Sequence, residues 1–232
     1  MARIGIITGV RREADCLAGL DLDGEAVDIR VAGADPQRAT ELAFDAAAKG
    51  AKGLLSFGLC GALDPDLPAA SILLPSRVIA AGGRALTCDP DWTGRLAEAL
   101  GDMVTQADVT LAHTTVIVAG PRRKSVLRAN TGAAAVDMES YAVGQAARKA
   151  GVPFAIIRAV SDTAETRLPE WTDEIVSSSG GTNGLRLLKN LATHPGDFGK
   201  LLALGRGSTR ALKRLRAVAD RLGTGFAFEG EG

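Results

Sequence analysis

The chain has 232 residues, of which 46% are hydrophobic and 23% charged, with 27 basic and 27 acidic side chains. This composition excludes a largely disordered or fibrous chain, and its length is typical of a single α/β domain. The zero net charge argues against nucleic acid as a partner, because non-specific binding to nucleic acid relies on a basic surface.

Cysteine and histidine are scarce. The three cysteines, Cys16, Cys60 and Cys88, form no CxxC pair, and there are two histidines. This leaves little material for a disulfide framework, a metal centre or Ser-His-Asp chemistry. The N-terminus has no signal-peptide pattern, and no apolar run approaches the roughly 18 residues of a membrane span. We expect a cytoplasmic protein without a metal or cofactor.

Short runs rich in Val, Ile and Leu alternate with longer amphipathic stretches. This rhythm is typical of parallel strands buried on both faces by helices, and therefore of the α/β class. The predicted strands are residues 3–7, 26–31, 53–57, 71–80, 109–118, 133–137 and 153–160.

Several helices have readable boundaries. Asp-Pro pairs at Asp35 and Asp89 predict capped starts for helices 36–49 and 91–100, and Gly151 predicts the end of a helix over 139–150. Residues 163–181 are polar and long for a connection, which is typical of a lid. Further helices are predicted over 182–192, 198–204 and 208–222.

Residues 199–232 differ in charge from the rest of the chain, with seven basic side chains against three acidic ones. Apolar residues recur here at helical spacing: Leu212, Leu215, Val218, Ala219 and Leu222. They predict one apolar stripe beside a basic face. The stripe either packs on the domain or lies on an anionic membrane surface.

Candidate functional residues follow the predicted strands, because ligands of open α/β sheets bind beyond the carboxyl ends of the strands. Four segments qualify: Thr8 to Glu13, Ser56 to Ala62, Val136 to Glu139 and Arg158 to Asp162. Each alone has a structural explanation. Gly58 and Gly61 are typical of turns, and an acid such as Glu13 often sits exposed in a first helical turn.

Arg158 is harder to explain structurally because it interrupts the apolar run from Ala155 to Val160. A buried guanidinium is costly unless it pairs with a carboxylate or phosphate. The sequence therefore predicts either a functional or a site-supporting role for this side chain.

Taken together, these segments resemble the nucleoside phosphorylase and nucleosidase superfamily. Its pattern is a Met-Glu pair, here Met138-Glu139, followed about twenty residues later by Arg-x-x-Ser-Asp, here Arg158 to Asp162. The opening run, residues 3–7, is similar to that of methylthioadenosine/adenosylhomocysteine nucleosidases. Residues 56–65 are most similar to the hopanoid-associated phosphorylase branch, also called adenosylhopane nucleosidase.

The resemblance implies a three-layer nucleoside phosphorylase-like fold, with a central, mostly parallel mixed sheet flanked by helices. Residues 1–198 would form the catalytic domain, and residues 199–232 its basic amphipathic helical extension. The implied reaction is cleavage of the adenine N-glycosidic bond of a 5′-substituted adenosine. In the hopanoid branch the substrate is adenosylhopane, in which the ribose is joined to a pentacyclic lipid.

Cleavage of this bond builds positive charge on the ribose and negative charge on the base, so acids on both sides of the bond are useful. Asp162, kept protonated by burial, would donate to N7 of adenine. Glu139 would accept from the ribose hydroxyls while Met138 packs on the sugar. The resemblance assigns the remaining substrate contacts to Ser161, Phe57, Gly58, Leu59 and Cys60.

The nucleophile stays open at this point. By resemblance, Glu13 matches the acid that orients water in hydrolytic members, whereas Arg12 lies where phosphorolytic members bind phosphate, together with Thr8 and Gly9. Inorganic phosphate is therefore a possible co-substrate, and the other arginines that would reinforce such a site are Arg11, Arg122, Arg123 and Arg158. Leu59 stands where small-substrate nucleosidases carry a serine, which favours a more hydrophobic substrate.

Two alternatives remain: a methylthioadenosine/adenosylhomocysteine nucleosidase, and a non-catalytic nucleoside-binding module on the same fold. The resemblance also implies a homo-oligomer, and the basic extension suggests peripheral contact with the inner face of a membrane.

Overall fold

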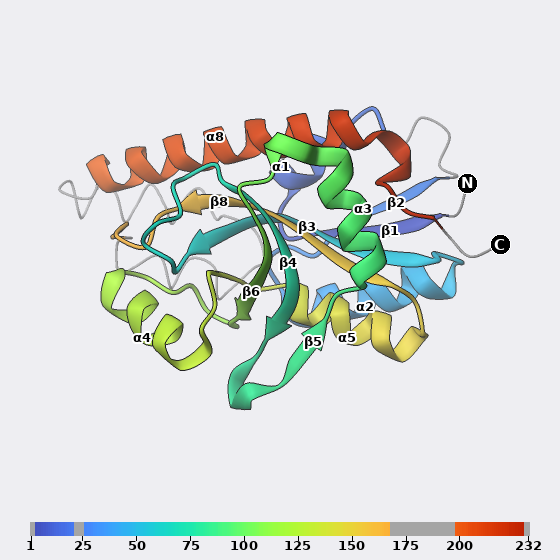
Figure 1. Ribbon diagram of the computed structural model, residues 1–232, viewed down its shortest axis with the longest axis horizontal. Coiled ribbons are helices and arrows are strands. Elements are labelled where there is room, and N and C mark those ends of the chain that lie inside the picture. The colour runs from blue at the N-terminus through green and yellow to red at the C-terminus, as the bar shows by residue number, and fades with distance from the viewer. Residues whose placement is uncertain (1–2, 21–25, 168–197, 230–232) are drawn as a thin grey trace.

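The computed structural model describes residues 3–20, 26–167 and 198–229, and its centre is one mixed sheet (Figure 1). The strands are β1 (Ile4–Thr8), β2 (Val27–Val31), β3 (Gly53–Ala62), β4 (Ile72–Ile79), β5 (Ala85–Thr87), β6 (Gln106–His113), β7 (Ala135–Asp137) and β8 (Phe154–Asp162). The helices are α1 (Arg11–Ala14), α2 (Pro36–Ala48), α3 (Pro90–Leu100), α4 (Pro121–Thr131), α5 (Ser140–Ala150) and α8 (Phe198–Leu222).

The sheet is mostly parallel, as predicted. Strands β2, β1, β3 and β8 run parallel to one another, as do β4, β6 and β7. The two groups join through antiparallel pairings of β3 with β7 and of β8 with β4. Strands β3, β8, β4, β6 and β7 therefore pair in a closed ring, and the ends of β1, β3, β7 and β8 approach one another.

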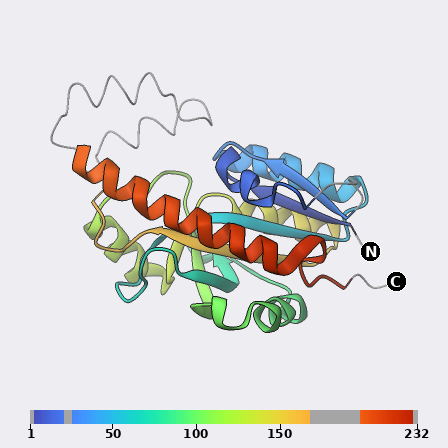
Figure 2. The same ribbon diagram turned by 90° about the horizontal axis from the view of Figure 1, so that it is seen from above.

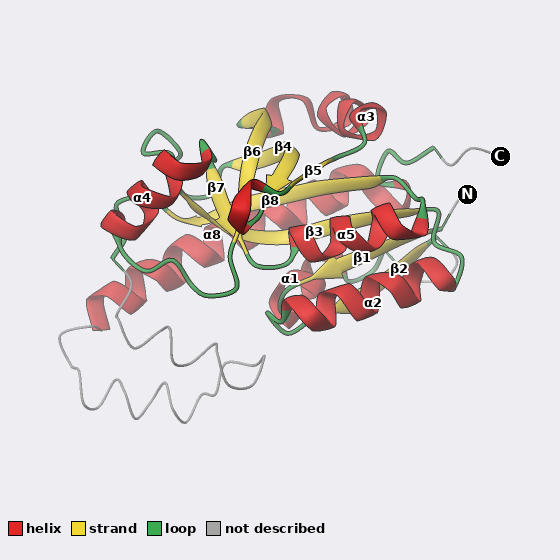
Figure 3. Cartoon of the chain, turned by 90° about the horizontal axis from the view of Figure 1, so that it is seen from below, coloured by secondary structure: helices red, strands yellow, loops and turns green. Residues whose placement is uncertain are grey.

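Helices cover both faces of the sheet (Figures 1 and 3). Alanines of α2 and α5, among them Ala43 and Ala146, pack in one core cluster, and a second cluster contains Trp92 of α3 and Leu215 of α8. The predicted caps are present: Asp35 accepts hydrogen bonds from the backbone N–H groups of Gln37 and Arg38, and Asp89 accepts one from Trp92. These caps satisfy donors that every helix start leaves open.

Several predicted boundaries were wrong. Strand β3 continues to Ala62, so Gly58 and Gly61 lie within a strand that pairs with β8, not in a turn. Strand β6 begins and ends earlier than predicted, and 198–204 and 208–222 form a single helix, α8. Helix α4 and strand β5 were not predicted. The predicted helix 182–192, and most of the predicted lid 163–181, fall outside the described residues.

Helix α8 lies along the sheet (Figure 2). Its apolar stripe faces the core, because Leu215, Val218 and Ala219 are fully buried and Leu212 and Leu222 pack against the same cluster. The apolar side is therefore used for packing, and its exposed side is basic. Within the described ranges, no helix is both long and apolar enough to cross a bilayer.

Gly207 lets α8 approach the end of β8. A Cβ at this position would lie 2.2 Å from the carbonyl oxygen of Ser161, whereas a Cβ at Gly205 would meet nothing within 4 Å. We expect Gly207→Ala to lower the free energy of unfolding by about 1–3 kcal/mol, because backbone must shift to relieve the clash. Gly205→Ala is the control and should stabilise by up to about 1 kcal/mol. Equal midpoints in urea unfolding for the two variants would contradict this close contact.

Candidate active site

Glu13 is buried where β1 ends and α1 begins. Its Oε2 accepts hydrogen bonds from the backbone N–H groups of Gly9, at 2.8 Å, and Val10, at 2.9 Å. Its Oε1 accepts one from Leu59 of β3, at 2.8 Å. A carboxylate oxygen has two acceptor positions, so Oε1 keeps one for a ligand or a water molecule.

Glu139 precedes the first residue of α5 and lies beside Glu13. A Cβ at Gly9 would lie 2.8 Å from Oε1 of Glu139 and 3.2 Å from Oε2 of Glu13. Glycine at this position therefore provides the space in which the two carboxyl groups come together. The Met138-Glu139 pair and the residues that follow β1 therefore lie next to each other in the fold.

Burial controls the protonation of both acids. Burial, together with the neighbouring carboxyl groups of Asp137 and Glu13, raises the pKa of Glu139 to about 8, against the opposing effect of Arg158. Burial also raises the pKa of Glu13, against the opposing effects of Arg158 and of the three backbone N–H groups. At neutral pH this pair of acids therefore holds at least one proton.

A buried ion pair between Arg158 of β8 and Asp137 of β7 lies near these acids. Nε and Nη2 of Arg158 donate to Oδ2 of Asp137 at 2.8 and 2.6 Å, and Nη2 is also 2.6 Å from Oγ of Ser56. Oγ of Ser140 lies 2.9 Å from the same nitrogen. Arg158 therefore has the carboxylate partner that its burial requires. Its charge also acts on the neighbouring carboxyl groups of Glu13 and Glu139.

Asp162 closes β8 and has two side-chain partners. The hydroxyl of Ser161 lies 2.6 Å from Oδ1, and the ammonium group of Lys124 on α4 contacts Oδ2. A Cβ at Gly61 would lie 3.2 Å from this carboxylate. The sequence predicted that burial keeps Asp162 protonated, and the structure places the buried cation Lys124 beside it.

Strand β3 connects the two ends of the site. A Cβ at Gly58 would lie 2.8 Å from the Glu13 carboxyl carbon, and Gly61 is adjacent to Asp162. Three residues of extended strand span about 10 Å. Glu13 and Glu139 therefore lie at one end of this glycine-containing segment and Asp162 at the other, a spacing that suits a ligand with the dimensions of a nucleoside.

The other predicted site residues differ in how accessible they are. Phe57 is fully buried with its ring against Phe226, at a centroid distance of 6.1 Å, and Cys60 packs in the opposite core cluster. Thr8 is buried and donates to the carbonyl of Arg30. Met138, Leu59 and Ser161 are half-buried, so part of each side chain remains accessible.

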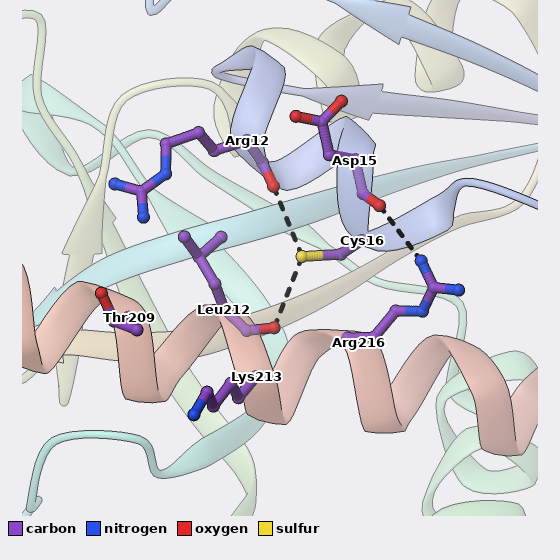
Figure 4. Close-up of a pocket in the computed structure, with 7 residues that line it drawn as sticks. All are labelled: Arg12, Asp15, Cys16, Thr209, Leu212, Lys213 and Arg216. Atoms are coloured by element: carbon purple, nitrogen blue, oxygen red, sulfur yellow. Dashed lines mark hydrogen bonds between the residues drawn. The ribbon is translucent and has the colours of Figure 1, made fainter.

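Arg12 lies on the α8 side of α1 and not with the acids. It lines an open pocket of about 260 Å³ between the start of the chain and α8 (Figure 4). The other lining residues are Asp15, Cys16, Thr209, Leu212, Lys213 and Arg216. Glu13 and Arg12 are adjacent in sequence but face different parts of the protein. The remaining arginine of this segment, Arg11, pairs with Asp15 on the surface at 3.3 Å.

The sequence did not predict the roles of two residues of the site, Asp137 and Lys124. The burial cost of Arg158 was a signal for an acid such as Asp137, which directly precedes Met138. No comparable signal marked Lys124, because α4 is basic and has no apolar stripe. Among the described residues, no group of three or more His, Cys, Asp or Glu side chains is arranged to hold a metal ion.

The fold and the site together define an α/β protein with a mixed sheet and with buried acidic side chains at the ends of its central strands. The chain belongs to the phosphorylase superfamily, whose family model matches residues 31–192. No match was found among curated proteins.

Solved structures share its nucleoside phosphorylase-like fold. A methylthioadenosine/adenosylhomocysteine nucleosidase from Neisseria meningitidis has a TM-score of 0.73 at 15% identity, covering 96% of this chain and 99% of that chain. Futalosine hydrolase from Helicobacter pylori has a TM-score of 0.70 at 16% identity, covering 94% and 97%. The nucleosidase from Helicobacter pylori has a TM-score of 0.66 at 19% identity, covering 83% and 98%. These relatives are enzymes that act on N-glycosyl bonds.

Proposed function

We propose that the protein hydrolyses the N-glycosidic bond of a 5′-substituted adenosine and releases adenine. The observation that carries this proposal is the set of three buried acids, with Glu13 and Glu139 at one end of a β3 segment and Asp162 at the other. Membership of the superfamily and the nucleosidases among its structural relatives support the same reaction class.

Each acid has a distinct role in this reaction. Glu13 orients the attacking water with the free acceptor position of Oε1 and takes its proton as oxygen bonds to C1′. Glu139 binds the ribose hydroxyls, with Met138 beside the sugar. The C1′–N9 bond breaks with its electron pair going to adenine, and N7 receives a proton from the side of Asp162.

Water is the proposed nucleophile because of the different positions of Glu13 and Arg12. A phosphate nucleophile needs cationic donors next to C1′, and a forked arginine is the most effective of these. Arg12 is exposed in the pocket beside α8, whereas Glu13 shares the space at Gly9 with Glu139. This arrangement favours hydrolysis over phosphorolysis.

For the 5′ substituent we propose the hopane skeleton of adenosylhopane, on the resemblance of residues 56–65 to the hopanoid branch. Phe57 and Cys60 are packed in the core, so the half-buried Leu59 is the residue of that segment that would contact the lipid. Contact with an anionic membrane would use the basic side of α8, because its apolar stripe is buried. We also propose that the protein acts as a homo-oligomer, which light scattering would measure.

The test is adenine release from adenosylhopane and from methylthioadenosine, with and without phosphate, followed by mass spectrometry of the sugar product. We expect phosphate-independent release and a free 1-hydroxy sugar, with adenosylhopane preferred. A sugar 1-phosphate formed only with phosphate would replace hydrolysis by phosphorolysis. Preference for methylthioadenosine would overturn the lipid substrate, and nucleoside binding without adenine release would indicate a non-catalytic module.

A further inference from the structure

Lys124 is an unusual residue for its helix. It is the buried residue of α4, with 1% of its surface exposed, while the rest of the helix is partly or fully exposed. Its ammonium group contacts Oδ2 of Asp162 and donates to the carbonyl of Thr163 at 2.6 Å. A long basic side chain thus leaves a solvent-facing helix and ends beside the acid that the proposed reaction places next to adenine.

Burial of this pair is not explained by stability. Taking an ammonium group out of water costs several kcal/mol, and a buried ion pair seldom stabilises a fold more than apolar side chains of the same volume. A lysine on an exposed helix could also point into solvent without that cost. The contact with Asp162 therefore calls for a role in the chemistry at that carboxylate.

Building on the proposed function, we propose that Lys124 is a positioning residue that holds the proton which Asp162 delivers to the departing adenine. The ammonium group and the carboxylate together carry one transferable proton. As the C1′–N9 bond breaks and its electron pair moves to the base, this proton passes from Nζ through the Asp162 carboxyl to N7. Water meanwhile gives its proton to Glu13, and solvent restores Lys124 and Glu13 when the products leave.

Among the described residues, other ionisable groups on the neighbouring elements are neutral or paired as follows. Burial raises the pKa of the Cys60 thiol of β3, so this group, which interacts electrostatically with Asp162 and Lys124, stays neutral. Asp137 of β7 is neutralised by Arg158 of β8. On α4 itself, Arg128 pairs with Asp64 at 3.1 Å on a more exposed side. Lys124 is thus the cation that directly faces Asp162 among the described residues.

The experiment compares Lys124→Met and Lys124→Arg with the control Arg128→Met, which removes a cation from the same helix. Two substrates are used: methylthioadenosine, whose leaving base needs a proton, and 4-nitrophenyl 5-methylthioriboside, whose nitrophenolate leaves without one. We expect Lys124→Met to lose about 10²-fold or more in kcat for methylthioadenosine and less than about fivefold for the nitrophenyl substrate. Arg128→Met should behave as wild type on both.

The pH profile gives a second readout. With Lys124→Met the proton must reside on the carboxyl group alone, which holds it less tightly than an ammonium group does, so the high-pH limb of kcat/KM should move to lower pH. Lys124→Arg keeps a cation that holds its proton more tightly and should move this limb to higher pH. Thermal melts establish whether each variant is folded. If Lys124→Met does not fold, the shift of the pH profile in Lys124→Arg still tests the inference.

Equal losses on both substrates with an unchanged pH profile would reduce Lys124 to a structural role and overturn the inference. That result would leave the proposed function intact, because the wild type would still release adenine. Absence of adenine release by the wild type would instead overturn both.

Discussion

Glu13→Gln is expected to lower kcat for adenine release by about 10²–10⁴-fold, the range over which a positioned general base contributes. The amide keeps the length and shape of the side chain but cannot take a proton from water. Its NH2 group must also face one of the backbone N–H groups of Gly9, Val10 or Leu59, which all donate to the carboxylate. We therefore also expect a loss of about 1–3 kcal/mol in the free energy of unfolding.

The matched control is Arg12→Gln, which alters the adjacent, exposed side chain in the pocket beside α8. Steady-state kinetics with and without phosphate should show less than about a threefold change for this variant, because it removes no group from the acid cluster. A large loss for Arg12→Gln that depends on phosphate, combined with mild effects for Glu13→Gln, would assign the nucleophile to phosphate instead.

The acids of the site were predictable because each one follows a strand that the hydrophobic pattern revealed. Glu13 and Glu139 come after β1 and β7, Asp162 is the last residue of β8, and the closed pairing of the central strands brings those ends together. The electrostatic environment was not predictable to the same degree. Lys124 reaches Asp162 from a helix 38 residues earlier, and no local pattern encodes that contact.

The errors around β3 have a related cause. Glycines in a sequence favour turns, yet Gly58 and Gly61 continue the strand because β8 and β7 supply its hydrogen-bond partners. Their lack of a side chain serves a different purpose, since the carboxyl groups of Glu13 and Asp162 occupy the space where a Cβ would lie. Phe57 was predicted as a substrate contact because the segment around it was expected to form a turn. Within strand β3 its ring instead faces the α8 side of the core.

Glu139→Gln is expected to increase stability at alkaline pH while removing activity. The carboxyl group of Glu139 titrates from an ordinary pKa of 4.5 in the unfolded chain, and in the folded protein burial raises its pKa to about 8. Between these values the folded state keeps a proton that the unfolded chain has lost. The free energy of unfolding of the wild type should therefore fall as pH rises through this window and level off above it.

Glutamine carries no such proton, so the variant lacks this contribution to the pH dependence. One unit of pKa shift corresponds to about 1.4 kcal/mol, and relaxation of the buried site reduces the total, so we expect a relative gain of about 2 kcal/mol for the variant between pH 5 and pH 9. Urea unfolding at both pH values measures it, and Glu98→Gln on the exposed side of α3 is the control. Parallel pH curves for wild type and Glu139→Gln would mean that Glu139 is already ionised in the folded protein. In that case its carboxylate would be ready to accept the ribose hydroxyls without first losing a proton.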